Sequence, residues 1–278
     1  MLTCYYGIKG RNLTIQLPWR DLPYMVVGDI SNTSRTPLVA LHGGPGLLQS
    51  SIFPLSDLAS FPSPIPVIFY DQIGNAHSTH LDDKPESFWT IDFFIDELTL
   101  LISMDTRGAV CLLLSSPFTK DTPASRKLQH QALMRCMQSI PEEVQLVLKK
   151  QGGKIDTSNK EYNKAAAYFC KQFGTRYADP MLEALAYSLR HEDHLVVLNA
   201  MLKGKINSDW DVTDKLHLIR VLTLLLNEKY NFIGDELCST FFCNINKVKW
   251  VQFAQSSHVP HWEERERYME VVKSFLVE

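Results

Sequence analysis

The chain has 278 residues, enough for one large domain or for a core with an inserted lobe. Hydrophobic residues make up 45% and charged residues 21%, which is ordinary for a globular protein. A net charge of −3 provides no basic patch for nucleic acid, and no apolar run approaches the roughly 20 residues of a membrane helix. We therefore expect neither nucleic acid nor a membrane as a partner.

The first ten residues, MLTCYYGIKG, lack the charged start and apolar core of a signal peptide. The six cysteines are scattered and no two pairs have zinc-site spacing, which favours free thiols in a reducing compartment. We expect a cytoplasmic protein with no metal and no cofactor. The sequence gives no oligomeric state.

Strands are predicted first in chain order, from "LTIQLPW" and "LPYMVVGD". Residues 36–46 (TPLVALHGGPG) and 65–78 (IPVIFYDQIGNAHS) are apolar runs that end in loops, typical of buried parallel strands. Apolar positions at 91, 94, 95, 98, 101 and 102 then predict a helix with Asp96 and Glu97 on its outer face. "GAVCLLLSSPF", at residues 108–118, predicts a third buried strand.

Residues 119–200 have a different character, with amphipathic segments such as "RKLQHQALMRCMQSI", "EEVQLVLKK" and "PMLEALAYSL". The α/β pattern resumes with "RVLTLLLNEKYN" and "KVKWVQFAQSSHVPHW", and a helix closes the chain. We predict an α/β core, residues 1–118 and 201–278, interrupted by a helical cap at residues 119–200.

Ligands of open α/β sheets bind beyond the carboxyl ends of the strands, where three loops carry candidate residues. His42-Gly43-Gly44-Pro45-Gly46 can point backbone N–H groups at an oxyanion, although such a loop also suits a tight turn. The loop at residues 70–78 is expected to pack beside it, with Asp71 hydrogen-bonded locally. His258, ahead of the final helix, occupies the place of a general base.

"PLVALHGGPG", "VIFYDQIGNAHS" and "VKWVQFAQSSHVPHWEERERYMEVVKSFL" resemble the proline iminopeptidase and L-amino-acid amidase branch of the α/β hydrolases, particularly its fungal members. The resemblance covers almost the whole chain. It implies a serine hydrolase that releases N-terminal proline or another amino acid from a peptide, an amide or a related small molecule. It also implies an oxyanion hole at residues 42–46 and cap carboxylates, for which Glu183, Glu192 and Asp193 are candidates, around the substrate amine.

The nucleophile of that family is missing from the sequence. The family carries a Gly-x-Ser-x-Gly-Gly elbow between the segments that match "IDELTLLIS" and "GAVCLLLSSP", where this chain has only Met104-Asp105-Thr106-Arg107. A strand, elbow and helix take roughly 20–25 residues. "GAVCLLL" is able to replace the lost strand, which brings Ser115 and Ser116 near the nucleophile position. However, Pro117 follows and no glycine permits the strained turn, so a plain strand end is the simpler interpretation.

The catalytic acid is also changed. The family pattern Asn-Gly-Arg-Tyr-Asp-Glu corresponds to residues 227–232, which puts Asn231 at the acid position, and Asp235 is a substitute only if the loop is rearranged. An amide in place of the acid lowers turnover about 10⁴-fold in a related triad.

Three interpretations remain open. The chain is a hydrolase whose elbow is lost from this polypeptide, for example by omission of a coding segment. Alternatively, it is an enzyme repurposed for small-molecule (secondary metabolite) biosynthesis, with His258 and His42 as acid or base. The third interpretation is a non-catalytic protein that binds a ligand. A peptide, an amide or an amino-acid-bearing small molecule is the expected partner in each case.

Overall fold

The structure is a computed structural model that describes residues 10–17, 20–31, 35–43, 48–75, 78–81, 83–105, 112–115, 124–150, 159–176, 197, 210–232 and 234–277. The chain forms two compact units, which are described one at a time. The first unit comprises Met1–Val110 and Leu182–Ile206, and the second comprises Cys111–Met181 and Asn207–Glu278. No helix among the described residues is long and apolar enough to span a membrane.

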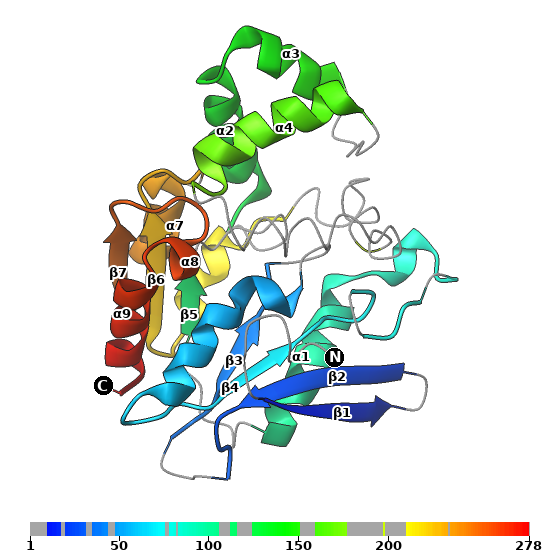
Figure 1. Cartoon of the computed structure of the whole chain (residues 1–278), viewed down its shortest axis with the longest axis vertical. Coiled ribbons are helices and arrows are strands. Elements are labelled where there is room, and N and C mark those ends of the chain that lie inside the picture. The colour runs from blue at the N-terminus through cyan, green and yellow to red at the C-terminus, as the bar shows by residue number, and fades with distance from the viewer. Residues whose placement is uncertain are drawn as a thin grey trace. The chain divides into compact units, whose positions relative to one another are not determined.

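The first unit is built on a four-stranded mixed sheet with the order β1-β2-β4-β3. Its strands are β1 (Arg11–Leu17), β2 (Arg20–Val27), β3 (Leu38–Leu41) and β4 (Val67–Tyr70). The pairs β1–β2 and β2–β4 are antiparallel, and β3–β4 is parallel. All four residues of β4 are buried, as its apolar run predicts. Figure 1 shows the β1–β2 hairpin in dark blue at the margin of this sheet.

Helical segments complete this unit: η2 (Gln49–Ser60), η3 (Glu86–Phe88) and α1 (Ile91–Asp105). The predicted helix is confirmed, but the prediction of its buried face was wrong in two places. Glu97 is fully buried, with its Oε2 accepting a hydrogen bond from the backbone N–H of Ile73 at 3.1 Å. Ile95 is instead 52% exposed. The hydrogen bond from a loop N–H rotates a carboxylate inward, which apolar spacing alone does not reveal.

The second unit contains a three-stranded parallel sheet with the order β5-β6-β7. Its strands are β5 (Leu112–Ser115), β6 (Thr223–Glu228) and β7 (Val248–Phe253). Every residue of the central strand β6 is buried, which is typical of a parallel strand covered on both faces.

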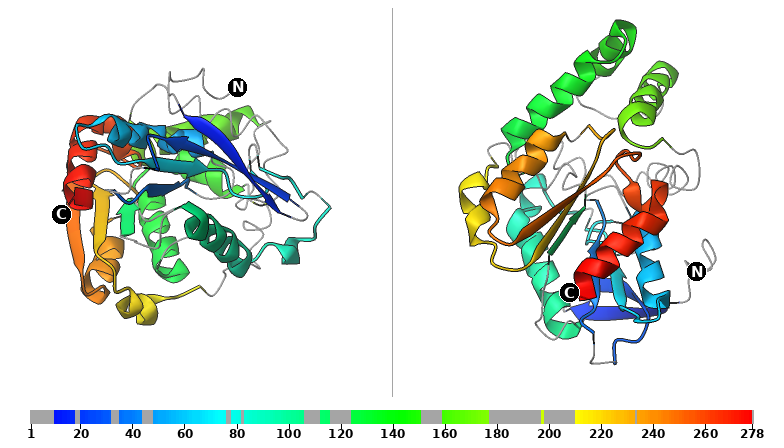
Figure 2. Two further views of the ribbon diagram at one scale, coloured as in Figure 1. Left: turned by 90° about the horizontal axis from the view of Figure 1, so that it is seen from below. Right: turned by 90° about the vertical axis from the view of Figure 1, so that its left-hand side faces the viewer.

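Helices α7 (Asp235–Asn244) and α9 (Arg265–Val277) cover opposite faces of this sheet (Figure 2). The Phe242 ring of α7 packs on Trp250, with 5.5 Å between ring centroids, and the Tyr268 ring of α9 packs on Phe253 at 5.6 Å. Residues 250 and 253 of one strand point to opposite faces because successive side chains alternate. Two shorter segments belong to this unit: η5 (Thr213–Leu218) precedes β6 in the sequence, and α8 (Pro260–Glu263) precedes α9.

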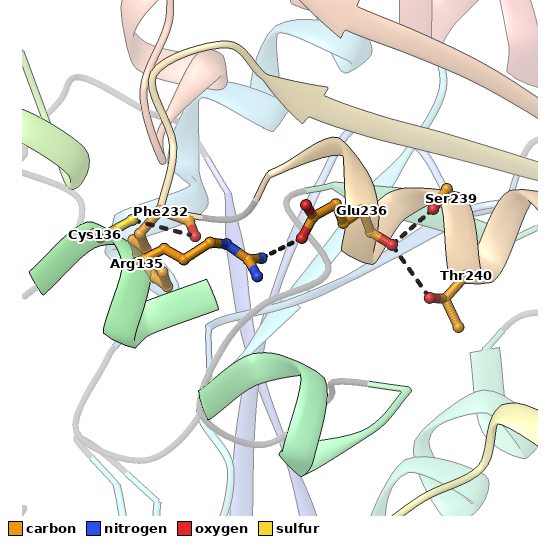
Figure 3. Close-up of polar contacts among 6 residues, drawn as sticks. All are labelled: Arg135, Cys136, Phe232, Glu236, Ser239 and Thr240. Carbon is orange, nitrogen blue, oxygen red and sulfur yellow. Dashed lines mark hydrogen bonds and ion pairs between the residues drawn. The ribbon is translucent and has the colours of Figure 1, made fainter. Parts of the chain in front are cut away.

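Three further helices of this unit, α2 (Arg126–Gln138), α3 (Glu142–Lys150) and α4 (Lys160–Phe173), lie beyond the carboxyl ends of its strands (Figure 1). They fall inside residues 119–200, where the sequence predicts a helical cap. The cap boundaries themselves stay a prediction. Figure 3 shows two contacts of α2. Arg135 pairs with Glu236 of α7, and the Cys136 thiol lies 3.7 Å from the carbonyl oxygen of Phe232, which precedes α7 in the sequence.

Among the described strands, β3 pairs only with β4 and β5 pairs only with β6. The described part of "GAVCLLL" is β5, which pairs in register with β6 from Leu112–Thr223 to Ser115–Leu226.

Candidate active site

His42 lies directly after β3 and is 5% exposed. Its Nε2 accepts a hydrogen bond from the backbone N–H of Gln72 at 3.1 Å. An accepting Nε2 carries no proton, so this contact holds the neutral imidazole in one tautomer. His42 therefore ties the loop after β3 to the loop after β4. Gly43 is described with it, whereas Gly44, Pro45 and Gly46 of the predicted oxyanion loop lie outside the described residues.

Asp71, predicted to be hydrogen-bonded locally, binds Gln49 at the start of η2, 22 residues earlier in the chain. Its Oδ1 accepts from the backbone N–H of Gln49 at 2.8 Å, and its Oδ2 accepts from Gln49 Nε2 at 3.2 Å. The Ser78 hydroxyl donates to the Asp71 carbonyl oxygen. Gly74 completes the turn with φ of +82°, where a side chain would also meet the Trp89 ring. These bonds fix the ends of β3 and β4 next to each other.

His258 follows β7 in the second unit, as the base of an α/β hydrolase does. Its backbone N–H donates to the Gly174 carbonyl oxygen at 3.1 Å, and its ring lies 4.9 Å from the Phe232 ring. Burial, and then the neighbouring His261, lower the pKa of His258 to about 4. His258 is therefore neutral at neutral pH.

Asn231, at the predicted acid position, faces a carboxylate. Its Nδ2 donates to Glu228 Oε2 at 2.6 Å, and both side chains are buried. An amide nitrogen is a donor, whereas the family residue it replaces is an acceptor. The side chain thus stabilises the end of β6 through Glu228 and is unable to act as an imidazolium-stabilising carboxylate.

Asp235, the possible substitute acid, is engaged elsewhere. Its Oδ1 accepts from Asn227 Nδ2 at 2.8 Å and from Gln252 Nε2 at 2.6 Å. Asn227 in turn accepts from Trp250 Nε1 at 2.8 Å. This network joins the start of α7 to β6 and β7, so Asp235 has a structural role there.

The weak nucleophile candidates stay predictions. Ser115 is the last residue of β5, where its backbone is paired in register with Leu226. Its side chain and the whole of Ser116 lie outside the described part of the chain, as do Glu183, Glu192 and Asp193 of the cap.

Sequence reasoning missed a buried carboxylate that organises the histidine loop. Glu263 accepts from the Ser257 backbone N–H, from Ser257 Oγ at 2.6 Å and from the Arg176 backbone N–H at 2.6 Å. The Gly174 carbonyl oxygen accepts hydrogen bonds from Ser257 Oγ, at 3.3 Å, and from the backbone N–H of His258. The signal was a glutamate five residues after His258 inside a short helix. Nothing in the sequence marked Gly174 or Arg176.

No family model matches the chain. It is 28% identical to the proline iminopeptidase of Saccharolobus solfataricus over 98% of this chain and 96% of that protein. It is 26% identical to the proline iminopeptidase of Thermoplasma volcanium over 88% and 90% of the two chains.

Two solved structures resemble the chain over nearly its whole length. The crystal structure of VinJ superposes with a TM-score of 0.84 and 27% identity, covering 96% of this chain and 98% of that one. Proline iminopeptidase from Mycobacterium smegmatis gives a TM-score of 0.77 at 22% identity, covering 96% and 97%. Together with a histidine loop after the last parallel strand, these likenesses define an α/β-hydrolase-fold protein. Within that class, the relatives that the chain resembles over most of its length are proline iminopeptidases.

The alignment with the Saccharolobus solfataricus protein is longer than this chain. It runs over 304 positions, whereas this chain has 278 residues. At no fewer than 26 positions the relative therefore has a residue and this chain has none. A strand, an elbow and a helix take a similar number of residues, roughly 20–25.

Proposed function

We propose that this chain derives from a hydrolase that releases N-terminal proline or another amino acid from a peptide or an amide. The present chain binds that class of substrate but forms no acyl-enzyme on a serine. The observation that carries the proposal is the exchange at the acid position, where Asn231 donates to the buried Glu228. Two further observations support it: the absence of a Gly-x-Ser-x-Gly sequence and the unmatched positions in the alignment.

The electrostatics of His258 support the same proposal. A general base that accepts a serine proton becomes an imidazolium. Here burial lowers the pKa of His258 to about 4, which disfavours the imidazolium. The base position is therefore occupied by a side chain suited to staying neutral.

The alternative of a repurposed biosynthetic enzyme is less well supported. It uses His42 as an acid or base together with His258. The Nε2 of His42 is already the acceptor for the Gln72 backbone N–H, and its side chain is buried. Protonating Nε2 would break that bond, so His42 is better suited to holding two loops together.

The test is to measure turnover and binding with the same compound class. Purified protein with a cooperative melt is incubated with a fluorogenic proline amide, and binding of prolinamide is measured by calorimetry. We expect binding without release of the fluorophore. Turnover that persists in Ser115→Ala would support the repurposed enzyme, whereas turnover lost in that variant would show a recruited serine. Absence of binding would contradict the substrate class.

A further inference from the structure

Three loops of the second unit are fastened together at the carboxyl ends of β6 and β7. The backbone N–H of Lys229 donates to the Phe253 carbonyl oxygen at 3.0 Å, and that of Tyr230 donates to the Ser256 carbonyl oxygen at 3.2 Å. The segment after α4 joins them through the bond from His258 to Gly174. Ligands of α/β sheets bind at this end of the strands, so side chains that project here are candidates for substrate contact.

Two cations flank one aromatic ring on this surface. The Arg176 guanidinium carbon lies 4.0 Å from the centroid of the Tyr230 ring, and Lys229 Nζ lies 5.7 Å from the same centroid. Both cations are exposed, and Tyr230 is 40% exposed. A guanidinium stacked on a ring keeps its N–H edge available for a planar anion. We refer to Arg176, Lys229 and Tyr230 as the cationic ledge.

Among the described residues, the carboxylates near the ledge accept hydrogen bonds from other donors. Glu263 binds Ser257 and the Arg176 backbone N–H, and Glu228 binds Asn231. Glu264 accepts from Ser256 Oγ at 2.5 Å and pairs with Arg267 at 3.6 Å. Among the described residues, neither Arg176 nor Lys229 forms an ion pair. No described carboxylate therefore pairs with the two positive charges of the ledge.

We propose that the cationic ledge binds the carboxylate of a short peptide, which makes free dipeptides rather than amides the preferred ligands of this chain. The inference rests on the proposed function for the substrate class and adds its charged end. Arg176 forms the fork that fits a carboxylate, and Lys229 adds a second positive charge. An ammonium group is repelled by both cations, so the amino end of the peptide lies away from the ledge.

The test compares two ligands that differ only in one charge, the dipeptide Pro-Gly and its C-terminal amide. Affinities are measured by calorimetry at about 50 mM salt, where screening is weak. We expect the dipeptide to bind about tenfold more tightly than the amide, as one charge-assisted hydrogen bond provides. We also expect this preference to decrease as salt is raised.

Variants of the ledge locate the effect. Arg176→Gln and Lys229→Gln are expected to weaken dipeptide binding several-fold and to leave amide binding within about twofold. Arg176→Lys should keep part of the preference because the charge remains while the fork is lost. Lys247→Gln is the matched control, since Lys247 is an exposed cation at the opposite end of β7. It should change neither affinity.

The outcomes separate this inference from the proposed function. Equal affinity for the two ligands, or a preference that survives Arg176→Gln together with Lys229→Gln, overturns the ledge but leaves peptide binding in place. If neither ligand binds to a protein that melts cooperatively, both the ledge and the proposed substrate class are wrong.

Discussion

Asn231 occupies the position at which the resemblance to proline iminopeptidases predicts a catalytic acid. Its Nδ2 donates to Glu228 Oε2 at 2.6 Å in a buried setting. Asn231→Asp restores the family residue but places two carboxylates face to face. We expect this variant to lose about 1–3 kcal/mol of unfolding free energy at pH 7, because a donor is lost and like charges repel.

The loss should depend on pH. The facing carboxylate raises the pKa of the new aspartate in the folded state, so the destabilisation is greatest above that pKa and shrinks as pH falls through it. Urea denaturation of wild type and variant at pH 7 and pH 5 measures the difference. Glu228→Gln combined with Asn231→Asp restores a donor and should recover most of the loss. An unchanged difference at the two pH values would contradict the contact.

His258 supplies a second pH dependence. Its folded pKa is lowered to about 4, below the ordinary value of about 6.5. Between these values the unfolded chain binds the proton more tightly, so stability is full above about pH 6.5 and decreases as pH falls toward 4. We expect His258→Gln to flatten this part of the stability curve. A proton NMR titration that places His258 at or above its ordinary pKa would contradict the account.

At the scale of elements, α8 holds the histidine loop through Glu263. The carboxylate receives three donors, from Ser257 and Arg176. Glu263→Gln leaves only one acceptor oxygen, so at least one buried donor loses its bond. We expect a loss of about 1–3 kcal/mol and faster hydrogen exchange at the Ser257 and Arg176 amides. Glu266→Gln, an exposed change on α9, is the matched control and should leave the exchange unaltered. Protection that persists in Glu263→Gln would show that another group holds the loop.

The elements themselves were largely predictable from sequence periodicity. Buried strands β4 and β6 have apolar runs, and the loops after them carry the polar residues that the site uses. The buried side of α1 was not predictable at Glu97, because its partner is a backbone N–H from a loop 24 residues earlier. Glu263 and Gly174 were likewise not predictable, because Glu263 binds Arg176 and Gly174 binds His258, and these partners are distant in sequence. Contacts between residues distant in sequence leave no periodic signal, so motif positions were easier to assign than the bonds that hold them.

For the whole chain, we infer that a strand, an elbow and a helix are absent between Met104 and Gly108. Among the described strands, β3 and β5 each pair on one side only. Parallel strands are normally covered by neighbours, and unpaired buried backbone groups cost about 1–3 kcal/mol each. Inserting a strand-elbow-helix segment from a relative between Met104 and Gly108 should therefore raise the melting temperature. An insert of equal length rich in Gly and Ser should not. Equal melting temperatures for the two inserts would contradict a vacant strand position.

We propose that this polypeptide has no nucleophilic serine, and covalent labelling provides a test. Purified protein is treated with a fluorophosphonate probe and its intact mass is measured, with digestion to locate any adduct. We predict an unmodified mass from a protein that melts cooperatively. A stoichiometric adduct on Ser115 or Ser116 would contradict the claim and show that the end of β5 has taken over the role of the elbow.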